Sequence, residues 1–296
     1  QVALPQAESS GAVFADYDND GDADLLVLNW GRNVLFANTA EGFVDVTAEA
    51  GLADDEAQSK TASWGDYDGD GDLDLYIANW SCYPRCGRPQ QGELDRLYRN
   101  GGDGTFTDVT VATLTGGRTR GAGFVASFVD YDNDGDADIY LVNDEFINPV
   151  GNALWRNDGP GCEGWCFTDV AAEVGANTKV MGMGLATADY DNDGDIDLYF
   201  SNAGPMAFLQ NQGDGTFVDV SAETGTDLGS EFIGWGTVFF DYDNDGWQDL
   251  YMAISDLLPS DDPADAFMRN DGAGSFEHVP PRVSGLDRDG RTLGVA

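Results

Sequence analysis

Aspartates recur with a fixed spacing at five places in the chain. The first cluster reads DYDNDGDAD at 16–24, and each copy fits D-x-D-x-D-G-x-x-D. Carboxylates at positions one, three, five and nine, with the backbone carbonyl of position seven, can supply about six or seven oxygen ligands, a set that suits Ca²⁺. Mg²⁺ prefers a stricter octahedron, and softer metals prefer Cys or His. Glycine at position six permits the sharp turn around an ion. The motif therefore predicts one calcium ion in each loop.

The candidate metal ligands follow from this alignment of the five loops. They are Asp16, Asp18, Asp20, Asp22 and Asp24; Asp66, Asp68, Asp70, Asp72 and Asp74; Asp130, Asp132, Asp134, Asp136 and Asp138; Asp189, Asp191, Asp193, Asp195 and Asp197; and Asp241, Asp243, Asp245, Trp247 and Asp249. Trp247 occupies position seven of the last loop. Because that position contributes only its carbonyl, the fifth loop is expected to bind calcium with one charge fewer.

Asp-rich loops of this kind have two other interpretations. An EF-hand requires Glu at position twelve and a helix on each side. Position twelve is instead apolar and lies in a β-prone run in every copy: Val27, Ile77, Leu141, Phe200 and Met252. The EF-hand is therefore excluded. A plain Asx turn without metal would explain one copy, but five unpaired carboxylate clusters at the same place in a repeat favour bound cations.

The runs around each loop predict β-strands. A short apolar run precedes each loop, at 11–15, 62–65, 121–129, 182–188 and 234–240, and an alternating run follows, at 25–29, 75–79, 139–143, 198–202 and 250–254. A second signature comes later in each repeat, as in LYRNGGDGTFTDVT at 97–110, and predicts a hairpin turn between two further strands. Four antiparallel strands in roughly 50 residues are typical of a β-propeller blade.

We therefore predict an all-β fold, a β-propeller of four-stranded antiparallel blades, within one domain at 1–296. The expected blades are 11–55, 59–112, 117–175, 178–226 and 230–286, and residues 287–296 are expected to form a partial strand that closes the ring or pairs with a partner molecule.

Charge and cysteine spacing limit the environment and the partners. With 54 acidic and 14 basic residues, the formal net charge of −40 argues against nucleic acid and anionic membranes as partners. No apolar run is long enough for membrane insertion.

Cysteines occur as two close pairs, Cys82 with Cys86 and Cys162 with Cys166. Each pair predicts a local disulfide and an oxidising compartment; a four-Cys zinc site is the alternative, although shorter spacing is more usual there.

Few residues offer any other chemistry. His278 is the one histidine, and no nucleophile–base constellation can be built around it. Neither a catalytic residue nor an organic cofactor is therefore expected, and the protein is not expected to be an enzyme.

Four tryptophans beside the motif strands could stack on sugars or fill the spaces between blades: Trp30, Trp64, Trp80 and Trp235. Asn79 begins a glycosylation sequon, but Asn recurs at the same strand end in other repeats, which favours a structural role.

The two linked motifs resemble the FG-GAP (VCBS-type) repeat family, known from the integrin α-subunit propeller, over about residues 11–286. The extended pattern, D-Y-D-N-D-G-D-x-D-L followed by N-x-x-G-D-G-T-F-x-D-V, is most similar to the cartilage-acidic-protein and ASPIC/UnbV-type group. The resemblance implies calcium between the first two strands of each blade and, in many members, seven blades, where this chain supplies five.

The expected function is that of an extracellular, secreted or cell-surface calcium-binding repeat protein with a structural or adhesive role, including as a subunit of a filamentous assembly. Its expected partners are a protein or glycan at the cell surface or matrix, and a second copy paired through the terminal strand. The alternative is a calcium-dependent, lectin-like carbohydrate-binding propeller.

Overall fold

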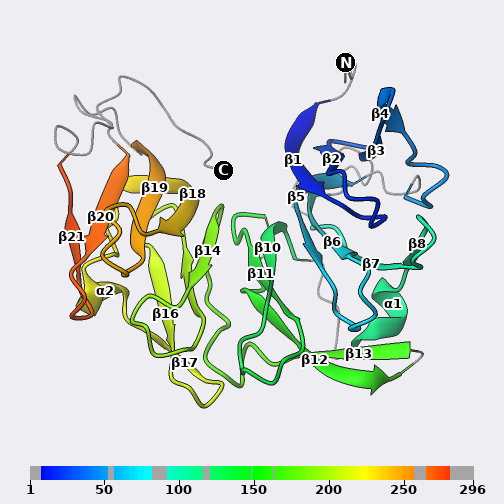
Figure 1. Ribbon diagram of the computed structural model, residues 1–296. Coiled ribbons are helices and arrows are strands. Elements are labelled where there is room, and N and C mark those ends of the chain that lie inside the picture. The colour runs from blue at the N-terminus through cyan, green and yellow to red at the C-terminus, as the bar shows by residue number, and fades with distance from the viewer. Residues whose placement is uncertain are drawn as a thin grey trace. The chain divides into compact units, whose positions relative to one another are not determined.

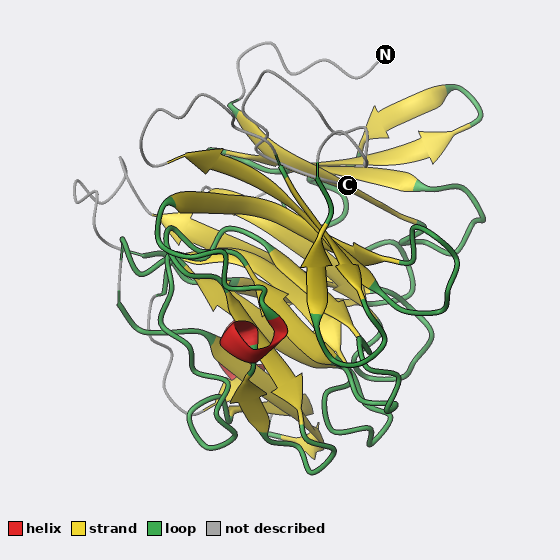
Figure 2. Ribbon diagram, turned by 90° about the vertical axis from the view of Figure 1, so that its left-hand side faces the viewer, coloured by secondary structure: helices red, strands yellow, loops and turns green. Residues whose placement is uncertain are grey.

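The computed structural model describes residues 8–52, 57–81, 92–115, 121–147, 149–162, 164–256 and 265–280. The chain divides into two compact units: 1–128 with 135–170, and 129–134 with 171–296. Strands dominate the described residues, and helix is confined to single short turns (Figure 2). No helix of this described part is both long and apolar enough to cross a membrane.

The first unit is built on three sheets, each with four antiparallel strands that follow one another in chain order from one side of the sheet to the other (Figure 1). The first sheet contains β1 (Ser9–Ala15), β2 (Asp24–Asn29), β3 (Val34–Thr39) and β4 (Gly42–Asp45); the second contains β5 (Gln58–Gly65), β6 (Asp74–Ser81), β7 (Arg96–Asn100) and β8 (Phe106–Asp108); the third contains β10 (Gly123–Val129), β11 (Asp138–Asn143), β12 (Ala153–Gly161) and β13 (Gly164–Asp169). The short helix α1 (Thr110–Thr113) leads into β9 (Leu114–Thr115), which joins the third sheet parallel to β13.

The second unit repeats the same order twice. Its sheets contain β14 (Leu185–Ala188), β15 (Asp197–Phe200), β16 (Ala207–Asn211) and β17 (Phe217–Asp219), and then β18 (Phe232–Phe240), β19 (Asp249–Asp256), β20 (Ala266–Asn270) and β21 (Phe276–His278). The helical turn α2 (Ser221–Thr224) connects the two sheets in sequence. Five consecutive four-stranded antiparallel sheets are the blade pattern of a β-propeller, so the predicted fold class is confirmed. The added parallel strand β9 was not predicted.

The second strand of each sheet forms the centre of the core. All six residues of β11 are buried, as are all four of β15. Tyr76, Tyr140 and Tyr199, one on each of three such strands, are fully buried. Since the side chains on both faces of these strands are buried, the strands are apolar almost throughout and do not alternate between apolar and polar residues.

The register of the first two strands fixes where each Asp-rich loop lies. Ala15 pairs with Asp24 in the first sheet, and the corresponding pairs in three others are Gly65 with Asp74, Ala188 with Asp197, and Phe240 with Asp249. Position nine of each motif is therefore the first residue of the second strand. The loop is thus the connection of a β-hairpin, as the sequence predicted.

Two other sequence-based interpretations concern the strand ends and the cysteines. Asn79 is fully buried, and its side chain donates to the carbonyl of Leu94 at 2.8 Å, which fits the structural role expected for it. Cys162 and Cys166 form the predicted disulfide within the β12–β13 hairpin, with an S–S distance of 2.05 Å. Cys82 and Cys86 lie outside the described residues, as does the strand expected at 287–296.

Candidate metal centres

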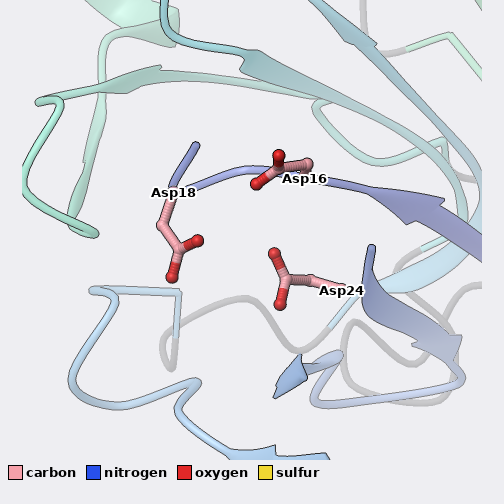
Figure 3. A group of neighbouring side chains, drawn as sticks. All are labelled: Asp16, Asp18 and Asp24. Atoms are coloured by element: carbon pink, nitrogen blue, oxygen red, sulfur yellow. The ribbon is translucent and has the colours of Figure 1, made fainter. Parts of the chain in front are cut away.

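Each Asp-rich loop wraps back so that carboxylates from both of its ends converge. In the first loop, Asp16 follows β1, Asp18 lies in the loop, and Asp24 opens β2 (Figure 3). One carboxylate oxygen from each of these residues lies within 4.8 Å of the others. Positions one, three and nine therefore form the centre of the predicted ligand set.

The other loops carry corresponding groups. The same convergence is made by Asp66, Asp68 and Asp70 in the second loop, by Asp189, Asp191 and Asp197 in the fourth, and by Asp241, Asp243 and Asp249 in the fifth. The third loop carries Asp130, Asp132 and Asp138 at positions one, three and nine of its motif. The converging group of the second loop includes position five instead of position nine.

Backbone hydrogen bonds hold the position-one carboxylate in place. Asp16 Oδ1 accepts from the N–H of Asp20 at 3.0 Å, and its Oδ2 accepts from the N–H of Gly21 at 3.0 Å. The N–H of Asp22 donates to Asp20 Oδ1 at 2.9 Å. Loops two, four and five repeat these bonds with nearly the same lengths. The loop conformation is therefore stabilised by its own backbone.

The position-nine carboxylate connects the loop to the rest of its sheet. Asp74 is fully buried; its Oδ2 accepts from the N–H of Tyr67 at 3.1 Å and its Oδ1 from the N–H of Asn100 at 2.8 Å. Burial raises the pKa of Asp74 to about 7 and that of Asp197 to about 8, although in each case hydrogen bonds from two backbone N–H groups act in the opposite direction. A bound cation would offset the cost of desolvating these charges.

Position three offers unsatisfied oxygens. Asp68 Oδ1 and Asp191 Oδ1 are buried and have no hydrogen-bond partner among the described residues. Burial, followed by the charges of neighbouring loop aspartates, raises the pKa of Asp68. A buried carboxylate oxygen without a donor is costly, and a cation supplies what it lacks. The donor set therefore fits a hard divalent ion that takes oxygen ligands.

The side chain of position seven points to a different partner. Asp72 Oδ1 accepts from Asn19 Nδ2 of the preceding loop at 2.8 Å, and Asp195 Oδ1 accepts from Asn133 Nδ2 at 2.6 Å. In the last loop, where Trp247 replaces Asp, Asn192 Nδ2 donates to the carbonyl of Gly246 at 3.1 Å. Position seven is absent from the converging carboxylate groups, in keeping with a role for its carbonyl alone.

Sequence reasoning missed the asparagine that supports each loop. The turn asparagine of one repeat donates through Nδ2 to the backbone carbonyl of the motif tyrosine in the preceding repeat. The pairs are Asn100 to Tyr17 at 2.8 Å, Asn157 to Tyr67 at 2.8 Å, Asn211 to Tyr131 at 2.6 Å, and Asn270 to Tyr190 at 2.8 Å. The sequence assigned these asparagines only to a hairpin turn. The sequence signal for this contact is that the turn asparagine and the tyrosine of the D-Y-D motif recur together from repeat to repeat.

The motif tyrosines are covered in the same four places. The ring of Tyr17 lies 5.7 Å from that of Phe106 in the following repeat, and that of Tyr67 lies 5.5 Å from Phe167. The first four motif tyrosines are at most 4% exposed. Tyr242 of the fifth repeat is 41% exposed, because none of the described residues of a later repeat covers it.

The sheets and loops define a class of protein: blade repeats that each carry one acidic loop able to hold a metal ion. This chain belongs to the FG-GAP-like repeat family, whose model matches residues 16–77, 87–141, 130–200 and 189–252. The resemblance proposed from the two motifs is confirmed.

The curated relatives carry one name. Cartilage acidic protein 1 of Xenopus tropicalis is 38% identical over 85 residues, which cover 28% of this chain and 13% of that protein. Human cartilage acidic protein 1 is 30% identical over 145 residues, covering 47% of this chain and 21% of that protein. The matches thus cover about a fifth or less of these relatives.

Two solved structures are similar to this chain at low sequence identity. One is an Agrocybe aegerita lectin described as recognising non-reducing terminal N-acetylglucosamine, with 19% identity, 91% coverage of this chain, 65% of that chain and a TM-score of 0.47. The other is the Vibrio cholerae biofilm matrix protein Bap1, with 14% identity, 91% and 39% coverage and a TM-score of 0.45.

Proposed function

We propose that each of the five loops binds one Ca²⁺ and that the bound ions stabilise the sheets they connect. The observation that carries this is the buried, unpartnered Oδ1 of Asp68 and of Asp191, each beside two other carboxylates of its loop. Without a cation, these charges repel one another and lack donors. All the converging side-chain ligands are oxygens, which favours Ca²⁺ over transition metals.

Calcium would act here mainly on stability. Asp16 and Asp24 stand at the two ends of one hairpin connection, so a shared ion would hold together the strands β1 and β2. An ion bound to the folded state and not to the unfolded chain raises the free energy of unfolding according to its concentration relative to Kd.

Calcium titration of the chelator-treated full chain by isothermal calorimetry tests this function, with Mg²⁺ as the control ion. We expect about five sites for Ca²⁺, weaker binding of Mg²⁺, and a melting temperature that falls sharply in excess EDTA. An unchanged melting temperature in EDTA, together with no calorimetric signal, would contradict calcium binding.

We further propose an extracellular structural or adhesive role, with a protein or glycan partner at the cell surface or matrix. The Cys162–Cys166 disulfide supports an oxidising compartment, and the relatives named cartilage acidic protein support a matrix setting. Assembly into filaments through residues 287–296 stays a prediction; its test is analytical ultracentrifugation of the full chain against a chain ending at residue 286.

Carbohydrate binding is the second candidate, and one tryptophan favours it. Trp30 is 47% exposed. Trp64 instead packs against the apolar core of the first two sheets, and the indole N–H of Trp235 donates to Ser255 Oγ at 2.8 Å. An exposed indole face is a common platform for a sugar ring, whereas packed indoles are not. Trp30 is the exposed one of the four candidate tryptophans, all of which the structure describes, so the carbohydrate candidate centres on it.

A further inference from the structure

Lys60 of β5 lies among three aromatic rings of the first unit. Its Nζ is 4.7 Å from the ring centroid of Trp80, 5.3 Å from that of Phe124 and 5.4 Å from that of Trp30. We call these four residues the Lys60 cage. Lys60 is one of two lysines in a chain with a formal net charge of −40, and the other, Lys179, is exposed.

The ammonium group of Lys60 forms no ion pair within the part of the chain that the structure describes. Several arginines, by contrast, form ion pairs, such as Arg156 with Asp158 at 2.7 Å. Cation–π attraction to the rings compensates for part of the water that Lys60 loses, but it satisfies none of its three N–H donors.

The carboxylate of Asp144, whose charge acts on Lys60, accepts hydrogen bonds from other donors. Asp144 Oδ2 accepts from Trp80 Nε1 at 2.9 Å, and Asp144 Oδ1 accepts from the N–H of Phe146 at 2.9 Å. Burial lowers the pKa of Lys60, and the charge of Asp144 offsets only part of that effect. A half-buried ammonium with free donors, beside a carboxylate that is already hydrogen-bonded, can accept one additional anion.

The exposed indole of Trp30 specifies the shape of the ligand. Trp30 is 47% exposed, and the centroid of its ring lies 5.4 Å from the same ammonium. A pyranose ring can pack its C–H face against an indole, and a carboxylate on that ring can pair with Lys60 Nζ. A neutral sugar would leave the ammonium donors unmatched, and a cationic ligand would be repelled by Lys60.

We propose that the Lys60 cage binds a carboxylated pyranose, that is, a uronic acid residue of a glycan. The strongly acidic chain would repel a densely charged polyanion, so a single terminal uronic acid fits better than a polyuronate. This ligand class deepens the carbohydrate candidate and rests on it, but it does not depend on calcium binding.

Saturation-transfer NMR on the calcium-loaded full chain, with methyl glucuronide, methyl glucoside and acetate as probes, tests the ligand class. We expect saturable binding of the glucuronide, at least about tenfold tighter than that of the glucoside, because a charge-assisted pair adds roughly 1.5 kcal/mol or more. Acetate should bind more weakly than the glucuronide. Equal binding of glucuronide and glucoside, or acetate as strong as the glucuronide, would overturn the proposal.

Variants separate the two parts of the cage. Lys60→Met should reduce glucuronide binding to the level of the glucoside, while Lys60→Arg should keep the preference. Trp30→Ala should abolish the binding of both sugars. Lys179→Met is the matched control, because it removes the other lysine, and it should change nothing. A folded Lys60→Met variant that keeps its preference for glucuronide would refute the proposal. If that variant does not fold, loss of preference in a folded Lys60→Arg variant would do the same.

Discussion

The side-chain amide of Asn100 donates to the backbone carbonyl of Tyr17, 83 residues earlier in the chain, at 2.8 Å. The same amide donates to the carbonyl of Leu73 at 3.1 Å, and the backbone N–H of Asn100 donates to Asp74 at 2.8 Å. One asparagine therefore contacts the first Asp-rich loop and the end of the second. The orientation of each loop depends on the repeat that follows it as well as on its own sequence.

Replacing Asn100 should be costly. Asn100→Ala removes both side-chain donors and leaves the carbonyl of Tyr17 without this donor in a buried setting, so we expect a loss of about 2–3 kcal/mol in the free energy of unfolding. Urea denaturation of the calcium-loaded chain measures it. Asn38→Ala is the matched control: Asn38 Nδ2 donates to the exposed carbonyl of Ala23, and we expect a loss of under about 1 kcal/mol. Equal losses would contradict the role of the asparagine bond between repeats.

Two aspartates of the first loop should respond differently to substitution. Asp18 belongs to the converging carboxylates, whereas Asp22 is exposed and stands outside that group. Asp18→Ala should remove one calcium ion from the total, because it removes a charged ligand. Asp22→Ala should keep the number of bound ions, because position seven contributes its carbonyl. Calorimetric titration gives both numbers, and loss of a site in Asp22→Ala would show that its carboxylate is a ligand.

The sequence was sufficient to predict the sheets and the Asp-rich loops between their first two strands, because each is encoded locally and repeated. The contacts between repeats were not predictable in this way. Nothing in the spacing of Asn100 and Tyr17 says that they meet, since the bond joins separate sheets. The cage around Lys60 was missed for a similar reason. Its aromatic residues come from just after β2, from the end of β6 and from β10, and the lysine does not recur in the other repeats. Local patterns specify strands, whereas packing between strands specifies these sites.

Asp95, a half-buried carboxylate outside the calcium loops, should make stability depend on pH. Burial raises the pKa of Asp95 to about 7, while hydrogen bonds, including one from the N–H of Asn79 at 2.7 Å, act in the opposite direction. Since the folded state binds this proton more tightly than the unfolded chain, the stabilisation is fully present below about pH 4 and is lost as the pH rises through about 7.

The variant Asp95→Asn tests this pH dependence. The amide stays neutral and still offers an oxygen to Asn79, so the variant should be more stable than the parent chain at pH 8 by a few kcal/mol, with the difference shrinking toward pH 5. Denaturation of both chains at several pH values, at one saturating calcium concentration, measures the difference. A difference that does not change with pH would show that Asp95 does not titrate in this range.

The two cysteine pairs can be separated by reduction. The Cys162–Cys166 bridge closes a very short loop, with a sequence separation of 4, so its effect on the unfolded chain should be modest. We expect the double variant Cys162→Ser, Cys166→Ser to lose about 2 kcal/mol or less in the free energy of unfolding. Adding a reductant to that variant then tests the predicted Cys82–Cys86 pair alone. A further loss of similar size is expected from an equally short loop, and no effect of the reductant would contradict the second disulfide.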